Sequence, residues 1–270
     1  MSGASGGLRT GRGGAWPKRE GGADGAGRLA ELLHSSRSAV VLTGAGISVP
    51  SGIPDFRSPG TGMWENIDPM EVASIDAFRR HPDRFWRFYG DRFASLHDRR
   101  PNPAHGAIAE LERRGLVRGV ITQNVDRLHR VAGTRRLIEI HGSIEWSVCL
   151  RCGGRVGLER VLELLASGQG APECAACAEP LKPDVVLFGE LLPQAAMQEA
   201  HALAREADLM LCVGSSLEVF PVASLPGVTR EGGGRLAIVT QGSTPYDREA
   251  EVRLSGDVVG ELEAVLAALG

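Results

Sequence analysis

The 270-residue sequence lacks long hydrophobic runs, although 43% of its residues are hydrophobic. No apolar stretch approaches the roughly 20 residues that a membrane-spanning helix needs, and no signal-peptide-like hydrophobic segment follows the start. The net charge of −3 gives no general attraction to nucleic acid or anionic membranes. We therefore expect a cytoplasmic protein with no membrane partner and no specific nucleic-acid partner.

Cysteine is also scarce, and four of the five cysteines form two C-x-x-C pairs, 149-CLRC-152 and 174-CAAC-177. In a cytosolic chain such pairs favour metal binding over disulfides. Cys149, Cys152, Cys174 and Cys177 fit a tetrahedral zinc site, which would be structural because protein ligands fill all four positions. A redox-active pair is the alternative. Cys212, within the apolar run LMLCV, is expected to be an inert buried thiol.

Residues 1–27 are rich in glycine and poor in apolar residues. Such a segment cannot bury enough surface to become ordered, so we interpret it as a flexible tail. Its few basic residues could contact an acidic partner, but a solvated tail is the simpler interpretation. The sequence contains no internal repeat.

Residues 28–270 alternate between short apolar runs and helical patterns. Continuous β-rich runs are typical of strands buried on both faces of a parallel sheet. Residues 104–115 and 194–207 have the spacing of helices. The fold class is therefore α/β, a doubly wound, Rossmann-like sheet. The runs expected as its strands are 39–43, 118–122, 136–140, 184–188, 208–213 and 236–240.

Two segments interrupt this alternation and are expected to form a smaller lobe. Residues 54–100 contain prolines, aromatic residues and helical patterns, and residues 144–181 contain the cysteine pairs. The Rossmann-like core would then comprise the remaining segments, 28–53, 101–143 and 182–270.

The first expected strand leads into 43-TGAGISVPSGIPDFRS-58. Gly44 and Gly46 would allow a tight turn and a close backbone approach to phosphate. Val49 occupies the third glycine position of the dinucleotide fingerprint, so spacing alone also allows an ordinary strand-to-helix turn. The prolines that follow argue against a long helix after this turn.

Longer motifs carry a specific resemblance. GAGISxxSGIPDFR, 122-TQNVDRLH-129, 141-HG-142, the cysteine pairs, 182-KPDVVLFGE-190 and 213-VGSSLEVFP-221 follow in this order. The chain resembles the sirtuins, NAD-dependent protein lysine deacylases, over essentially residues 28–268. The resemblance implies NAD as cofactor, one structural zinc ion and acyl-lysine proteins as partners.

The resemblance also implies the cofactor contacts. Sirtuins usually have an asparagine after the strand that corresponds to residues 236–240. Here Thr240 or Gln241 replaces it, which puts the contacts with the adenosine end of NAD in doubt. A surface pair of Asp126 with Arg127 is the alternative for that position. The implied NAD-binding residues are Gly44, Ala45, Gly46, Ser48, Asp55, Phe56, Arg57, Gln123, Asn124, Val125, Asp126, Gly214, Ser215, Ser216, Thr240 and Val258.

By the same resemblance, His141 is the general base, and Asn124 and Asp126 complete the catalytic group. Imidazole titrates near neutral pH, which suits this role. In the implied reaction, the acyl oxygen attacks C1′ of the ribose as nicotinamide departs, giving an alkylimidate. His141 then assists the attack of a ribose hydroxyl, and the products are lysine, nicotinamide and O-acyl-ADP-ribose.

The implied substrate site holds the peptide as an added strand between two segments, which requires mainly main-chain hydrogen bonds. Its residues are Val186, Phe188, Gly189, Leu217, Glu218 and Val219. Ala73, Tyr89 and Arg92 resemble the residues of the sirtuin branch that removes succinyl and malonyl groups. Arg92 would bind the acyl carboxylate in two bonds. Alternatively, Arg92 extends into solvent or pairs with Asp91 or Glu71.

Two other functions share these motifs. A protein ADP-ribosyltransferase of the same fold needs no functional acyl pocket, and a non-catalytic NAD-sensing zinc-ribbon scaffold would not need intact catalytic residues. His141, Asn124 and Asp126 are all intact, which argues against the scaffold. We expect a monomeric deacylase.

Overall fold

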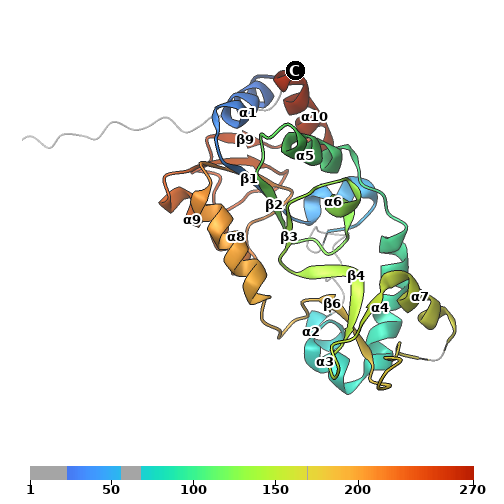
Figure 1. The fold of residues 1–270 in the computed structure, drawn as a ribbon. Coiled ribbons are helices and arrows are strands. Elements are labelled where there is room, and N and C mark those ends of the chain that lie inside the picture. The colour runs from blue at the N-terminus through green and yellow to red at the C-terminus, as the bar shows by residue number, and fades with distance from the viewer. Residues whose placement is uncertain (1–22, 56–67, 169) are drawn as a thin grey trace, which may run out of the picture.

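The computed structural model describes residues 23–55, 68–168 and 170–270, arranged as two lobes of unequal size (Figure 1). The large lobe is built on a six-stranded parallel sheet with the order β3-β2-β1-β7-β8-β9. Its strands are β1 (Ala39–Thr43), β2 (Gly119–Thr122), β3 (Leu137–Glu139), β7 (Leu209–Val213), β8 (Arg235–Val239) and β9 (Val252–Leu254). This confirms the predicted fold class.

Helices cover both faces of this sheet. The helices α1 (Ala23–Ser35), α5 (Pro103–Arg113) and α10 (Val258–Leu269) pack in one apolar core with alternate strand residues. On the other face, α8 (Gln194–Glu206) and α9 (Leu225–Glu231) pack in a second core. The short helix α6 (Leu128–Val131) follows β2. Burial on both faces explains why the strand runs are continuously apolar.

One strand prediction is wrong in its location. The run 184–188 was expected in the parallel sheet, but β6 (Leu181–Val185) pairs antiparallel with β4 (Gly142–Cys149) in a separate sheet. A short strand buried in a second sheet has the same apolar pattern, so the pattern cannot tell the two places apart. The sixth place in the large sheet belongs to β9, whose three residues are too few for a recognisable pattern.

The small lobe combines the three-stranded sheet β5-β4-β6 with helices from two segments. These elements are β5 (Arg155–Gly157), α2 (Pro69–Val72), α3 (Ile75–Arg80), α4 (Pro82–His97) and α7 (Leu158–Ala166). An aromatic core formed around Phe78, Phe85, Trp86 and Phe93 joins the helices to the sheet. The inserted segments thus come together as expected, although β4 and β6 extend into ranges assigned to the core.

The N-terminal boundary also differs from the expectation. Helix α1 begins at Ala23, so residues 23–27 of the expected tail are helical, and Ala26 is only 2% exposed. The reason is tertiary, because α1 packs along α10. Residues 1–22 lie outside the described residues. Within the described part of the chain, no helix is both long and apolar enough to cross a membrane.

Candidate active site

The loops after β1 and β7 touch backbone to backbone. Gly44 donates its N–H to Val213 O at 3.0 Å, and Gly46 donates to Gly214 O at 2.8 Å. A Cβ on Gly46 would lie 2.8 Å from the Cα and carbonyl oxygen of Gly214. Gly214 has a φ of +61°, and a Cβ there would lie 2.3 Å from the nitrogen of Ile47. Glycine is therefore required at these positions by both close approach and conformation.

Two short 3-10 turns, Ala45–Ile47 and Val49–Ser51, replace a regular helix after β1, as the prolines predicted. This leaves an open loop of small residues at the carboxyl edge of the sheet, where doubly wound folds bind their ligands. The glycines of this loop leave its main-chain N–H groups uncovered by side chains, which suits the close approach of a dinucleotide phosphate.

The segment after β2 places a polar network beside this loop. Asn124 donates from Nδ2 to Gly44 O at 3.1 Å and to Ser48 Oγ at 3.2 Å. Ser48 in turn donates from Oγ to Asp126 Oδ2 at 2.6 Å. Gln123 donates from Nε2 to Ser215 Oγ at 2.9 Å, which links this segment to the loop after β7. Three loops that are distant in sequence thus form one site.

Asp126 is only 6% exposed. Burial raises the pKa of its carboxyl group, while hydrogen bonds from Ser48 and from the Leu128 N–H act in the opposite direction. A surface pair with Arg127 is therefore wrong for this carboxylate. Arg127 instead lies 4.0 Å from Glu159 of the small lobe, between Nη1 and Oε1.

His141 follows β3 and is oriented by the same segment. Its Nδ1 lies 2.9 Å from the carbonyl oxygen of Gln123, so Nδ1 must donate the hydrogen. Burial lowers the pKa of the imidazole, and the bond to Gln123 opposes this only in part. The neutral ring then carries its lone pair on Nε2, which is the arrangement that a general base needs.

The remaining expected cofactor residues are distributed as follows. Ala45 and Asp55 are half-buried, and Ser216 is exposed. The apolar side chain of Val125 packs against the small-lobe core. Thr240 follows β8, and its carbonyl accepts a hydrogen bond from Arg253. Val258 begins α10, and its side chain is buried in the large-lobe core. Phe56 and Arg57 lie outside the described residues.

Two buried histidines beneath the site were not anticipated. His105 Nε2 lies 3.4 Å from Ser48 Oγ, and His129 Nε2 lies 3.0 Å from Thr43 Oγ1. Burial lowers the pKa of His105 to about 4 and that of His129 to about 3. The Asn-Pro-x-His pattern at 102–105 forms a capping box for α5, and this local signal could have placed His105 at a helix start.

The expected peptide segments lie at the junction of the lobes. Val186 donates its N–H to His141 O at 2.8 Å, and Phe188 donates to Ala73 O at 3.0 Å. The side chains of Phe188 and Val219 are 45% and 38% exposed. The side chain of Leu217 is 2% exposed within the large-lobe core, which leaves its main chain for the expected peptide contact. Gly189 and Glu218 are exposed.

Helix α4 carries two of the three expected acyl-pocket residues, Tyr89 and Arg92, and Ala73 follows α2. Tyr89 packs on Phe85 and Phe93, with ring centroids 4.7 and 5.3 Å apart. Burial raises the pKa of Tyr89 to about 12, and the charge of nearby Arg92 opposes this rise. Ala73 is 2% exposed. Tyr89 also belongs to the same apolar core as Val125 and Leu187, from the cofactor and peptide segments.

Arg92 is half-buried, with its guanidinium 4.2 Å above the centre of the Phe88 ring. Within the described ranges it has no carboxylate partner. Glu71 pairs with Arg84 at 3.8 Å, and Asp91 is exposed. The alternative in which Asp91 or Glu71 neutralises Arg92 therefore has no support in the structure.

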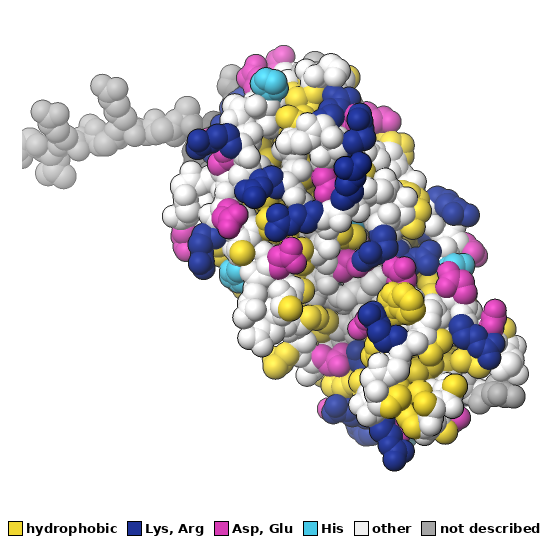
Figure 2. Space-filling view, in the orientation of Figure 1, with side chains coloured by type: hydrophobic (Ala, Val, Ile, Leu, Met, Phe, Trp, Pro, Cys, Tyr) yellow, Lys and Arg dark blue, Asp and Glu magenta, His cyan; other side chains and the backbone are white. Residues whose placement is uncertain are grey.

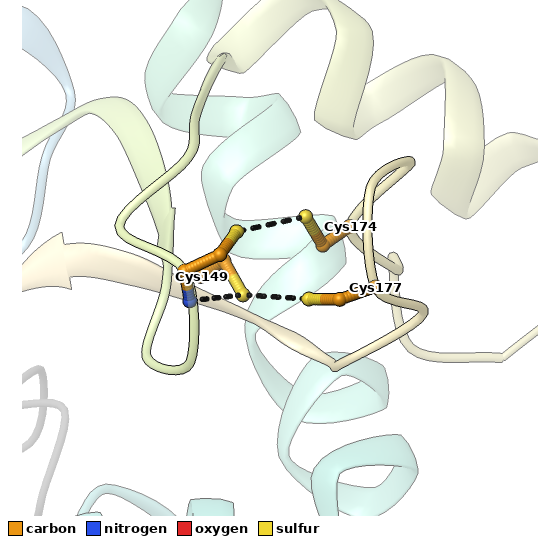
Figure 3. A group of neighbouring side chains, drawn as sticks. Cys149, Cys174 and Cys177 are labelled. Atoms are coloured by element: carbon orange, nitrogen blue, oxygen red, sulfur yellow. Dashed lines mark hydrogen bonds between the residues drawn. The ribbon is translucent and has the colours of Figure 1, made fainter.

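The four cysteines of the two pairs converge at the end of the small lobe. Their Sγ atoms all lie within 4.8 Å of one another, with Cys149 3.4 Å from Cys177 and Cys152 3.6 Å from Cys174. Figure 3 shows Cys149, Cys174 and Cys177 directed toward one another from two chain segments. Thiolates about 2.3 Å from a tetrahedral zinc ion stand at nearly these separations. The cluster is suited to one structural zinc ion.

Figure 2 shows basic and acidic side chains interspersed over both lobes on the face drawn, with apolar side chains gathered on the small lobe. No broad basic surface is visible on this face. This agrees with the near-neutral composition of the chain.

A model of the Sir2 family matches residues 44–221. The chain is 47% identical over 225 residues to an NAD-dependent protein deacetylase of Sulfolobus acidocaldarius, covering 83% of this chain and 87% of that protein. It is 46% identical over 228 residues to NAD-dependent protein deacylase 2 of Pyrobaculum aerophilum, covering 84% and 89%.

Solved structures agree with these relatives. A Sir2 structure with a p53 peptide and NAD+ superposes with a TM-score of 0.82 at 43% identity, covering 89% of this chain and 96% of that one. Sir2Tm bound to a propionylated peptide gives 0.81 at 42% identity, covering 90% and 98%. Sequence and structure lead to the same assignment: the chain belongs to the Sir2 family.

Proposed function

We propose that this sirtuin uses NAD to remove acyl groups from lysine side chains of proteins. The observation that carries the proposal is the position of His141. Its Nδ1 is fixed by Gln123 O, and its main-chain carbonyl accepts from Val186 of the expected peptide segment. The expected base and the expected peptide edge are therefore held together. Relatives named as NAD-dependent deacetylases and deacylases support the same activity.

Different residues of the site would bind NAD, orient its ribose and transfer the proton. Gly44, Gly46 and Gly214 would allow the close approach of the NAD phosphates, and Asn124 and Asp126 would orient the nicotinamide ribose. Bound NAD supplies the electrophilic ribose carbon and nicotinamide as the leaving group. His141 Nε2 would take the proton from a ribose hydroxyl, which requires the neutral ring that burial favours.

We further propose that Tyr89 and Arg92 direct the enzyme toward acidic acyl groups such as succinyl and malonyl. Arg92 lies one helical turn from Tyr89 and has no carboxylate partner in the described ranges. A half-buried guanidinium without a counter-ion favours a ligand that supplies one. The small side chain of Ala73 would leave room for the longer acyl chain. The ring of Phe88 supports the guanidinium plane.

The test compares one peptide carried as acetyl-, succinyl- and malonyl-lysine, with wild type and Arg92→Met. Loss of charged hydrogen bonds to the acyl carboxylate should lower kcat/KM for succinyl and malonyl roughly 10- to 100-fold and leave acetyl nearly unchanged. Arg87→Met is the matched control, because Arg87 is exposed on the same helix. It should change none of the three rates.

His141→Asn tests the chemistry rather than the selectivity. It should lower kcat for all three acyl groups by about 100- to 10,000-fold, the usual contribution of a general base. Mass spectrometry should detect O-acyl-ADP-ribose as a product of wild type. ADP-ribose attached to protein without that product would instead favour ADP-ribosyl transfer. Preference for acetyl, with equal losses in Arg92→Met, would contradict the acidic-acyl proposal alone.

A further inference from the structure

Lys182 is one of only two lysines in the chain, and its side chain is 6% exposed. It lies in β6, at the start of the segment 182–190 that contains the expected peptide residues Val186, Phe188 and Gly189. Its ammonium group forms an ion pair with Glu190 Oε2 at 2.9 Å and donates to the carbonyls of Val185 at 2.8 Å and Pro183 at 3.1 Å. All three donors of the ammonium group are thus used, which offsets the cost of burying the charge.

Glu190 closes the segment from its other end. The same Oε2 atom accepts the N–H of Leu187 at 2.8 Å, and the Glu190 N–H donates to Leu187 O at 3.0 Å. Residues 187–190 therefore form a turn whose conformation depends on the carboxylate. The ion pair joins the start of the 182–190 segment to its end.

Residues 182–190 and the adjacent Leu181 form hydrogen bonds with three functional parts of the protein. Val186 donates to the main chain of His141, and Phe188 both donates to Ala73 O and accepts from the Ile75 N–H at 3.0 Å. On the small-lobe side, the indole of Trp86 donates to the carbonyl oxygen of Leu181, next to Lys182, at 2.8 Å. The segment thus touches the expected base, the acyl pocket and the helix that bears Arg92.

We infer that the Lys182–Glu190 pair is a positioning clamp that holds the peptide-binding edge in register with His141 and with the acyl pocket. This inference rests on the proposed deacylase function and identifies which residues set its substrate affinity. Among the described residues, the polar contacts of the Lys182 ammonium group and of the Glu190 carboxylate all lie within residues 182–190, away from the NAD loops. The clamp should therefore act on peptide binding and spare NAD binding.

The test measures binding and turnover on the full chain with Glu190→Ala and Glu190→Gln. Glu190→Ala removes both the ion pair and the turn contact, and should weaken peptide affinity and raise the peptide KM roughly ten-fold or more. The KM for NAD should stay within about two-fold, because the glycine-lined loops are untouched. Glu190→Gln keeps an acceptor for the Leu187 N–H, so its effect should be smaller.

Asp184→Asn is the matched control, because Asp184 also lies in β6 and forms an ion pair, with Arg155 Nη2 at 2.7 Å, but on the exposed surface. It should alter neither KM. Peptide affinity is also measured directly, by fluorescence anisotropy of a labelled acyl-lysine peptide, together with calorimetric binding of NAD.

A peptide affinity within two-fold of wild type in Glu190→Ala would overturn the clamp, as would a parallel loss of peptide and NAD binding. If Glu190→Ala fails to fold, Glu190→Gln decides by the same split between the two ligands. If the wild type binds the peptide but shows no NAD-dependent turnover, the proposed function is wrong. The clamp is then tested by the peptide affinities of wild type and Glu190→Ala, measured by anisotropy. A wild type that binds no acyl-lysine peptide would overturn both.

Discussion

The carboxyl edge of the large sheet and the acyl side of the small lobe hold their functional groups by different means. At the sheet edge, the loops after β1 and β7 meet through main-chain atoms, and a Cβ on Gly46 would come within 2.8 Å of Gly214. In the small lobe, Tyr89 and Arg92 are side chains of α4 resting on aromatic neighbours. A main-chain contact constrains several residues together, whereas a helix side chain can be exchanged alone.

This difference indicates where selectivity can change without loss of the chemistry. Substitutions at Tyr89 or Arg92 alter the pocket and leave the Asn124–Ser48–Asp126 network in the other lobe in place. The Lys182–Glu190 clamp lies between the two regions, because its segment contacts both His141 and Ala73. The following predictions test how independent the two regions are.

Removal of zinc should have the largest effect, because it should unfold the small lobe and leave the large sheet folded. Cys174→Ser, or chelation of the wild type, should release the zinc ion, whose binding in zinc-finger peptides contributes roughly 10–16 kcal/mol to folding. The small lobe should then become sensitive to protease within residues 144–181, and deacylation should be lost. Zinc content by mass spectrometry, limited proteolysis and turnover measure these outcomes.

Cys212→Ala is the matched control for zinc removal, because Cys212 is buried in β7, in the large lobe. It should retain one zinc ion per chain. An intact, active small lobe without zinc would contradict a structural role for the metal. Simultaneous unfolding of the large sheet would show that the lobes are not independent.

Five of the six predicted runs are strands of the large sheet, because continuous apolar runs directly reflect burial on both faces. The pattern could not place β6, since the antiparallel β4–β6 pair buries a similar run. Helical patterns were expected within residues 54–100, but they do not show which side of α4 is covered: Trp86 is buried and Phe88 is only half-buried. Tertiary packing decides which side of an aromatic-rich helix is covered.

The polar site was predictable where residues follow strands in recognisable motifs. Gln123 and His141, which the resemblance assigns to one site, lie 2.9 Å apart between the Gln123 carbonyl oxygen and His141 Nδ1, while their roles in the reaction stay predictions. The roles of Lys182 and Glu190 were not predicted, because an ion pair between a strand and the turn that follows it has no spacing that distinguishes it from two solvated charges. The contact of His105 with Ser48 spans 57 positions and follows only from the three-dimensional fold.

The two buried histidines should make the large-lobe edge sensitive to acid. Their pKa values, about 4 for His105 and about 3 for His129, lie below the value near 6.5 expected in the unfolded chain. Their contribution to stability is therefore complete above pH 6.5 and is lost as pH falls, on the order of 5 kcal/mol between pH 7 and 4. Asp126 opposes this trend, because burial raises its pKa.

Urea unfolding at several pH values measures this effect in wild type, His129→Gln and His34→Gln. His129→Gln removes one of these titrations and should flatten the pH dependence measurably. His34 is exposed, so His34→Gln should follow the wild type. An unchanged slope in His129→Gln would show that acid sensitivity arises elsewhere.

A pair of glycine substitutions compares the sheet edge with an ordinary helix position. Gly214→Ala places a Cβ 2.3 Å from the Ile47 nitrogen at a φ of +61°, and should destabilise the protein by roughly 2–4 kcal/mol. It should also raise the KM for NAD, because the loops after β1 and β7 must separate. Gly27→Ala, in α1 with no atom within 4 Å of the added Cβ, should stabilise the protein by about 0.5–1 kcal/mol.

Urea unfolding measures the stability of both variants, and NAD kinetics measure the KM for NAD. If Gly214→Ala were tolerated as well as Gly27→Ala, the two loops would not be fixed by their main chains, and the contrast with the acyl side would fail.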